Sequence, residues 1–324
     1  MRLAATFAAA LVLALLAVPS ADARSRYVLA SALPNSGLTR IFLDTFLAEM
    51  RQRAPAVTID LALDGRLGGE AELVDQLKAG EHELHLGVLH SAIHYPELDA
   101  TLVPYLFPDY PSVERFLAGP VGRRMGDALA RRGHAVALGT WDMGQRWTTS
   151  AKRFETVEEL HDIKIRMPEI PLWIKVWGGM GAAVAPIAAP EVPAALRAGT
   201  VDAQENVLSN ILGRRMYETQ AFLIETAHQQ AYVSVLAHKG FWQKLPPDLR
   251  RQMQEAVDRA TDAATDGVRA ENAAILERLS AAGMTRVQPA PGFRRKAQLV
   301  IEKAARDTLA PGIYEAALAA IEGR

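Results

Sequence analysis

Three polar side chains in the second half of the chain stand at or near the ends of segments that have the pattern of buried strands. Arg166 ends the segment 164–166, Asn206 follows the segment 201–205, and Arg146 follows a third such segment. In open α/β sheets, ligands bind outside the carboxyl ends of the strands. If the second sheet is doubly wound, we expect these three side chains to gather at one crevice.

The chemistry that these residue types offer is recognition of a carboxylate. A guanidinium presents a planar fork of donors that can pair both carboxylate oxygens at once. This favours a clamp at Arg166, with Asn206 donating its amide to the same group. Each residue also has a structural alternative. Arg166 could pair with an internal acid, and Asn206 could cap a helix. Arg146 could stack on Trp147 at the surface.

Other side chains are weaker candidates for ligand contacts. Glu70 and Glu72 follow a glycine-rich turn and could accept from a hydroxyl or ammonium, although acids also favour the first turn of a helix. Trp173 could line a pocket. It stands four residues from Trp177 on an expected helix, so both could equally belong to the core.

The histidines do not form a recognisable metal motif. The spacing of His82, His85, His90 and His94 fits neither a zinc-binding helix pair nor a zinc finger, and the chain has no cysteine. The sequence also lacks a nucleophile elbow, a phosphate loop and a dinucleotide glycine pattern. We therefore expect no catalytic residues, no cofactor and no metal.

Alternating strand and helix patterns must position these residues. The pattern predicts a mostly parallel sheet with helices on its faces. Strands are expected at 27–30, 57–63, 84–89, 135–141, 164–167, 183–187, 201–205 and 231–237. Helices are expected at 38–50, 70–78, 112–131, 171–180 and 190–198, and from 207 onward. Helical spacing from Pro247 to about Leu279 predicts a helix of about 48 Å, long enough to run along two lobes.

Length, charge and the N-terminal segment limit the class of protein. A chain of 324 residues exceeds one ordinary domain, so we expect two lobes. The formal net charge of −1 gives no support for nucleic acid or an anionic membrane as partner. Arg2, an apolar run over 3–18 and the small residues around Ala23 predict a secretory signal peptide cleaved near Ala23. The expected compartment is the periplasm.

Four segments, in their order and spacing, resemble the DctP-type periplasmic solute-binding proteins of TRAP transporters. They are GRLGGEAELVDQLKAG (65–80), LVPYLFPDY (102–110), KIRMPE (164–169) and ALRAGTVDAQEN (195–206). The resemblance extends over nearly the whole mature chain. It implies a two-lobe, periplasmic-binding-protein-like α/β fold. Each lobe would hold a mixed, mostly parallel sheet flanked by helices, and one long helix would span both lobes.

The resemblance also implies roles for residues. The arginine that matches Arg166 pairs the ligand carboxylate, the asparagine that matches Asn206 supports it, and the arginine that matches Arg146 adds a second contact. From the other lobe, groups near Asn35 or Glu70 would complete the site. The small run 187–190 stands where relatives often carry an aromatic residue, and Gly87 or its apolar neighbours stand where sialic-acid binders carry an acidic residue. These two departures argue against sialic acid as the ligand.

The sequence therefore predicts capture of a small carboxylate between two lobes and its delivery to TRAP membrane permease subunits, without catalysis. An alternative is a periplasmic protein that presents its ligand to a membrane sensor kinase, and a third reading is a hydrolase or isomerase on the same lobes. The expected organisation is a signal peptide at 1–23, lobe 1 at 24–144 plus about 231–255, lobe 2 at 145–230, a long helix at about 247–282 and C-terminal helices at 283–324.

Overall fold

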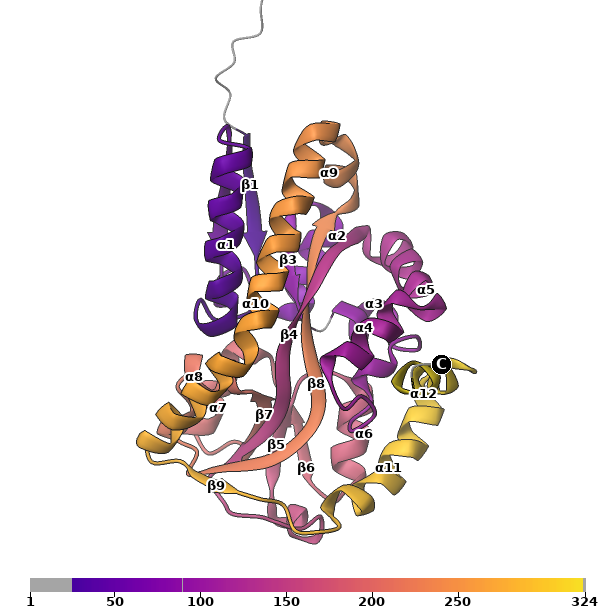
Figure 1. The fold of residues 1–324 in the computed structure, drawn as a ribbon. Helices are drawn as coiled ribbons and strands as arrows, with labels where there is room; N and C mark the ends of the chain where they lie inside the picture. The colour runs from indigo at the N-terminus through magenta and orange to yellow at the C-terminus, as the bar shows by residue number, and fades with distance from the viewer. Residues whose placement is uncertain (1–24, 89, 323–324) are drawn as a thin grey trace, which may run out of the picture.

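The computed structural model describes residues 25–88 and 90–322, so the expected signal peptide lies outside the described residues. Hydrogen-bonded strands follow the order β2-β1-β3-β8-β4-β7-β5-β6, with β9 beside β8. The β2-β1-β3 end and the β7-β5-β6 end lie in two lobes, and β4 and β8 pass from one to the other (Figure 1). The expected two-lobe α/β fold is confirmed.

The first lobe is built from strands paired in parallel and helices that cover them. β1 pairs in parallel with both β2 and β3. Helix α1 buries Leu38, Phe42 and Phe46, whose spacing of four residues places them on one helical face. The elements are β1 (Ser25–Ala30), α1 (Gly37–Arg53), β2 (Val57–Ala62), α2 (Glu70–Ala79), β3 (Leu84–Gly87) and α3 (His90–His94).

The second lobe repeats the pattern, with β5 parallel to both β6 and β7. Thr156 and Glu159 form a capping box: the Glu159 carboxylate accepts from the Thr156 backbone N–H at 2.9 Å, and the Glu159 backbone N–H donates to the Thr156 hydroxyl at 3.4 Å. The elements are η3 (Glu158–Asp162), β5 (Lys164–Met167), α6 (Pro171–Gly179), β6 (Ala183–Pro186), η4 (Ala189–Glu191), α7 (Val192–Arg197), β7 (Ala203–Val207), α8 (Leu208–Gly213) and η5 (Met216–Glu218).

Three long elements connect the lobes: β4 (Ala135–Ser150), β8 (Phe222–His238) and α10 (Pro247–Ala281). The expected strand at 135–141 was too short, because β4 continues for nine more residues through register shifts in its pairing with β8. Arg146 therefore lies within β4 and not after its end. The boundaries expected at 144/145 and 230/231 fall inside β4 and β8, and they stay a prediction.

The expected helix at 112–131 is wrong as a single element. It divides into α4 (Tyr110–Ala118) and α5 (Pro120–Ala128), followed by the π-helical turn η2 (Leu129–Gly133). Gly119 ends α4, and Pro120 begins α5 because its ring lacks an N–H and fits a first helical position. The remaining elements are η1 (Ala100–Leu102), α9 (Lys239–Lys244), β9 (Thr285–Val287), α11 (Phe293–Thr308) and α12 (Ile313–Ile321).

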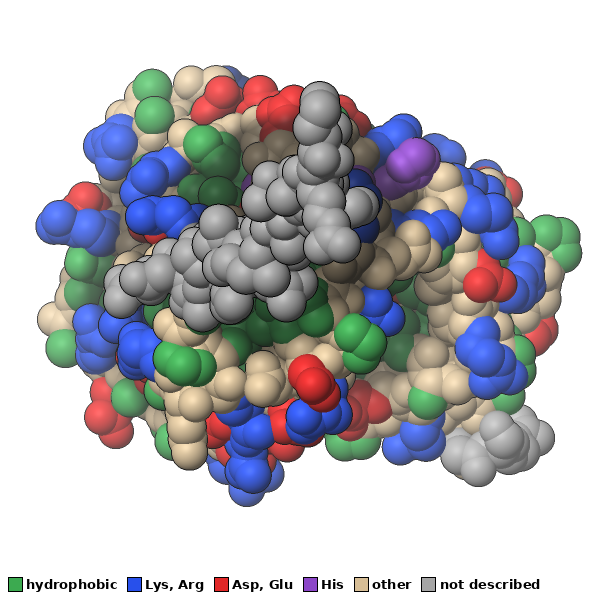
Figure 2. All heavy atoms as spheres, turned by 90° about the horizontal axis from the view of Figure 1, so that it is seen from above, with side chains coloured by type: hydrophobic (Ala, Val, Ile, Leu, Met, Phe, Trp, Pro, Cys, Tyr) green, Lys and Arg blue, Asp and Glu red, His purple; other side chains and the backbone are tan. Residues whose placement is uncertain are grey.

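Two large apolar clusters stabilise the fold. One joins α1, β4 and α10, where Phe42 stacks on Trp141 with ring centroids 4.5 Å apart. The other contains Trp173 and Trp177 of α6 together with residues of α4, α5, α11 and α12. Among the described residues, no helix combines the length and apolarity needed to cross a membrane. Basic and acidic side chains intermix on the face shown in Figure 2, in keeping with the net charge of −1.

Candidate functional site

Arg166 lies in β5, and its charged group is buried with little compensation. The residue is 2% exposed, and its Nε donates to the Ile187 carbonyl at 2.7 Å. Within the described part of the chain, its guanidinium forms no ion pair with a carboxylate. Burial lowers the pKa of Arg166 to about 9; the charge of Glu205 opposes this shift, whereas the charges of Arg146 and Arg214 add to it. Arg166 thus stays positive at neutral pH, and a nearby anion would stabilise that charge.

A cavity of about 480 Å³ lies beside Arg166 and is lined from both lobes. The first lobe contributes the turn before α2, the start of α2 with Glu70, and part of α3. The second lobe contributes Arg166 and the segments that follow β5 and β6. The lobes are in contact here, since a Cβ built on Gly65 would lie 2.7 Å from Cγ of Pro190. The cavity has the volume and position of a small-molecule site between two lobes.

Glu70 stands at the start of α2 and faces this cavity with its carboxylate fixed. Its Oε1 accepts from the Val88 backbone N–H at 3.0 Å and lies 3.3 Å from Nε2 of His85. The His85 ring is itself held by the Ala30 carbonyl at 3.1 Å from Nδ1. Glu70 therefore brings a positioned acceptor to the first-lobe wall.

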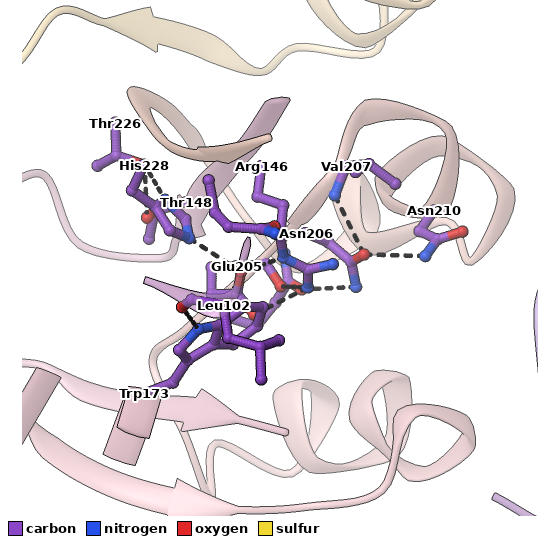
Figure 3. A network of polar contacts seen from close by, with 12 residues as sticks. Leu102, Arg146, Thr148, Trp173, Glu205, Asn206, Val207, Asn210, Thr226 and His228 are labelled. Atoms are coloured by element: carbon purple, nitrogen blue, oxygen red, sulfur yellow. Dashed lines mark hydrogen bonds and ion pairs between the residues drawn. The ribbon is translucent and has the colours of Figure 1, made fainter. Parts of the chain in front are cut away.

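Arg146 is buried but already paired (Figure 3). Its Nε and Nη2 lie 2.5 Å and 2.9 Å from the two carboxylate oxygens of Glu205, and its guanidinium lies over the Trp173 ring, 5.0 Å from the centroid. The expected alternative of a surface arginine on Trp147 is wrong. Arg146 and Trp173 line a second, much smaller cavity next to Gln229 and Tyr232.

Glu205 and His228 were not recognised from sequence, and they complete this network (Figure 3). Nε2 of His228 lies 3.0 Å from the Glu205 carboxylate, and Nδ1 lies 2.9 Å from the Thr226 hydroxyl. Burial acts to raise the pKa of Glu205, but the charge of Arg146 and the hydrogen bonds from His228 and Arg146 hold it well below its usual range. Burial lowers the pKa of His228, so the neutral ring donates from Nε2 to Glu205.

The carboxylate of Glu205 could have been suspected from sequence. It lies within a segment otherwise expected to be buried, and a buried acid requires a cationic or donor partner. The partner itself could not be named, because Arg146 and His228 lie on two other strands.

The other expected site residues fall in different places. Asn206 is 4% exposed on β7, and its Oδ1 accepts from Nδ2 of Asn210 at 2.9 Å. Trp173 is in the core and donates from Nε1 to the Leu102 carbonyl at 2.6 Å. Asn35 is exposed on the first lobe and lines neither cavity.

The strands that carry the three central residues are adjacent, since β7 pairs with both β4 and β5. Arg166 and Arg146 nevertheless line different cavities and Asn206 lines neither of them, so their gathering at one crevice stays a prediction. Within residues 25–88 and 90–322, no three His, Cys, Asp or Glu side chains are arranged to hold a metal ion.

Comparison with known proteins places the chain in a family. The family model of the bacterial extracellular solute-binding proteins, family 7, matches residues 32–310. A sialic acid-binding periplasmic protein of Vibrio cholerae is 27% identical over 75% of this chain and 77% of its own length. The C4-dicarboxylate-binding periplasmic protein of Rhodobacter capsulatus is 24% identical over 82% and 80%.

Solved structures agree with the two-lobe fold. A sugar acid binding protein of Advenella mimigardefordensis in complex with galactonate superposes with a TM-score of 0.87 at 22% identity, covering 92% of this chain and 98% of that one. A TRAP solute-binding protein of Shewanella oneidensis with bound succinate gives a TM-score of 0.86 at 21% identity, covering 92% and 100%. Since the family model spans most of the sequence, the chain belongs to the bacterial extracellular solute-binding proteins, family 7.

Proposed function

We propose that this protein captures a small organic acid in the cavity between its lobes and delivers it to the membrane permease of a TRAP transporter. The observation that carries the proposal is the buried Arg166 guanidinium beside a cavity lined from both lobes. A buried guanidinium without an ion-pair partner can bind a carboxylate strongly, because its planar donors match the two carboxylate oxygens. Relatives named for sialic acid and for C4-dicarboxylates support an acidic ligand.

The compartment and the lack of turnover are part of the same proposal. Relatives are named as periplasmic proteins, and the N-terminal segment of this chain has the pattern of a secretory signal. The protein binds its ligand and releases it unchanged, which product analysis after prolonged incubation would check. Uptake of the ligand into permease-containing vesicles only when this protein is added would support delivery.

The test of binding is calorimetry on the full mature chain with C4-dicarboxylates, 2-oxoacids and sugar acids. Arg166→Ala should weaken the tightest ligand at least tenfold, about 1.4 kcal/mol, because the ligand loses a charge-assisted hydrogen bond. Arg215→Ala is the matched control, since Arg215 is exposed and pairs with Glu218. Unchanged affinity in a folded Arg166→Ala protein would remove Arg166 from the site.

A further inference from the structure

The side chains that line the interlobe cavity have an unequal balance of charge. Among the described lining residues, Arg166 is the one basic side chain, whereas four are acidic: Glu70, Glu72, Glu169 and Glu191. Glu72, Glu169 and Glu191 are exposed at the rim, and Glu70 is partly buried on the first-lobe wall. The lining thus accommodates one negative charge beside Arg166 and repels a second.

Arg146 does not change this balance. Both of its hydrogen-bonding edges toward Glu205 are occupied, and the pair together is neutral. If a ligand carboxylate took the place of Glu205 beside Arg146, the Glu205 carboxylate would stay buried and lose its cationic partner. The charge of Arg146 and the hydrogen bonds from His228 and Arg146 hold the pKa of Glu205 well below its usual range despite its burial. Because Arg166 is the one guanidinium among the described residues that line this cavity, a second ligand carboxylate finds no second guanidinium on its walls.

The first-lobe wall favours donors instead. The Glu70 carboxylate is held in place by the Val88 backbone N–H and stands across the cavity from the lobe that carries Arg166. An oxygen anion attracts a hydroxyl or an ammonium and repels another carboxylate. Between these two ends the wall is apolar, formed by Ala92, Ile93, Ile170, Ile187 and three prolines.

From these walls we infer that the cavity selects monocarboxylates whose far end carries a hydrogen-bond donor, a hydroxyl or an ammonium, and rejects dicarboxylates. The inference rests on the proposed binding function and narrows its ligand class. The carboxylate pairs with Arg166, the uncharged middle lies along the apolar wall, and the donor end faces Glu70.

The test uses ligand pairs that differ only at the far end, measured by calorimetry on the full mature chain. One set is succinate, 4-hydroxybutyrate and 4-aminobutyrate, and another is glucarate and gluconate. In each set that binds, the monocarboxylate should bind at least tenfold more tightly than the dicarboxylate. The comparison of 4-hydroxybutyrate with 4-aminobutyrate distinguishes the two donor classes. This comparison needs no variant, so it does not depend on a mutant that folds.

A variant then assigns the discrimination to one side chain. Glu70→Gln should reduce the ratio of dissociation constants between the dicarboxylate and the monocarboxylate of a pair at least threefold. Glu81→Gln should leave this ratio unchanged, because Glu81 is an exposed acid of the same lobe that does not line the cavity. A dicarboxylate that binds as tightly as its partner would overturn the inference while supporting carboxylate binding. An equal ratio in wild type and Glu70→Gln would also overturn it. Failure of every acid to bind would overturn the proposed function itself.

Discussion

Glu205 connects three strands through its carboxylate, which accepts from Arg146 on β4 and from His228 on β8. All three side chains are buried, and charges held this way are costly to leave without a partner. We expect Glu205→Gln to reduce the free energy of unfolding by about 3–5 kcal/mol, because the Arg146 charge loses its counterion. Urea unfolding at neutral pH measures this.

The matched control for Glu205 is Glu302→Gln. Glu302 pairs with Arg306 at 3.1 Å, but both side chains are about half exposed (48% and 50%), so loss of this pair should cost about 0–1 kcal/mol. If the two substitutions cost the same, the buried network does not stabilise the fold as described.

His82 is a buried imidazole whose two ring nitrogens form no hydrogen bond with the described residues. The residue is 1% exposed. Burial lowers its pKa to about 4, with smaller contributions from His85 and His238. The unfolded chain therefore takes up a proton first as the pH falls from about 6.5, and stability is lost progressively down to about pH 4.

A substitution at His82 should reveal this loss. Because His82→Leu removes an unpaired polar ring of similar size, stability at pH 7 should be unchanged or higher. Between pH 7 and pH 4 the variant should lose about 2–3 kcal/mol less than wild type. Urea midpoints at the two pH values check this, and the difference between proteins cancels the opposite effect of Asp142, whose pKa burial raises to about 6. If wild type and His82→Leu lose the same free energy of unfolding between pH 7 and pH 4, the loss does not come from His82.

At the residue scale, the burial of Arg166 could be predicted from the sequence, whereas the ion pair of Arg146 could not. Arg166 lies within a short strand of four residues, and its side chain is buried as that position predicts. The partner of Arg146 stands 59 residues away on another strand. Pairing across strands depends on register, which local periodicity does not encode.

At the scale of elements, the turn before α2 closes on the opposite lobe. Gly65 has φ +70°, and a Cβ there would meet Pro190 at 2.7 Å. Gly65→Ala should weaken ligand affinity at least threefold, because the added methyl opposes closure. Calorimetry with the tightest acid measures the effect.

Gly199 provides the control for Gly65. It has φ +67°, but a Cβ there would meet no described atom within 4 Å. Both alanines carry the cost of a left-handed backbone, about 1–2 kcal/mol of stability. Only Gly65→Ala should bind the ligand more weakly. If Gly65→Ala and Gly199→Ala lose the same affinity, backbone strain and not the contact with Pro190 is the cause.

The lengths of elements were the least predictable part of the fold. Residues 144–150 contain glycine and several polar side chains, which is typical of a loop, yet β4 continues through them. Bulges at Asp142/Gly144 and Arg146/Thr148 absorb the irregularity, and Thr148 and Thr149 are buried with hydrogen-bond partners. Helical periodicity likewise continued across Gly119, where the proline that follows divides the helix.

At the scale of the whole molecule, contacts between the lobes add to the connection made by β4, β8 and α10. Arg214 makes one of them. It follows α8 in the second lobe, and its Nη2 donates to the Ala32 carbonyl in the first. Its Nε is buried without a partner among the described residues, and burial lowers its pKa while Asp64 opposes that shift. We expect this bond to break if the lobes separate into a more open form, because its two partners lie on different lobes.

Loss of the Arg214 contact should therefore shift the protein toward the open form. Since a ligand binds a partly populated closed state with proportionally lower affinity, Arg214→Gln should weaken binding about tenfold and increase the radius of gyration of the ligand-free protein in small-angle scattering. The neighbouring Arg215→Gln, which removes an exposed arginine paired with Glu218, should change neither quantity. If Arg214→Gln binds and scatters like wild type, closure does not depend on this bond.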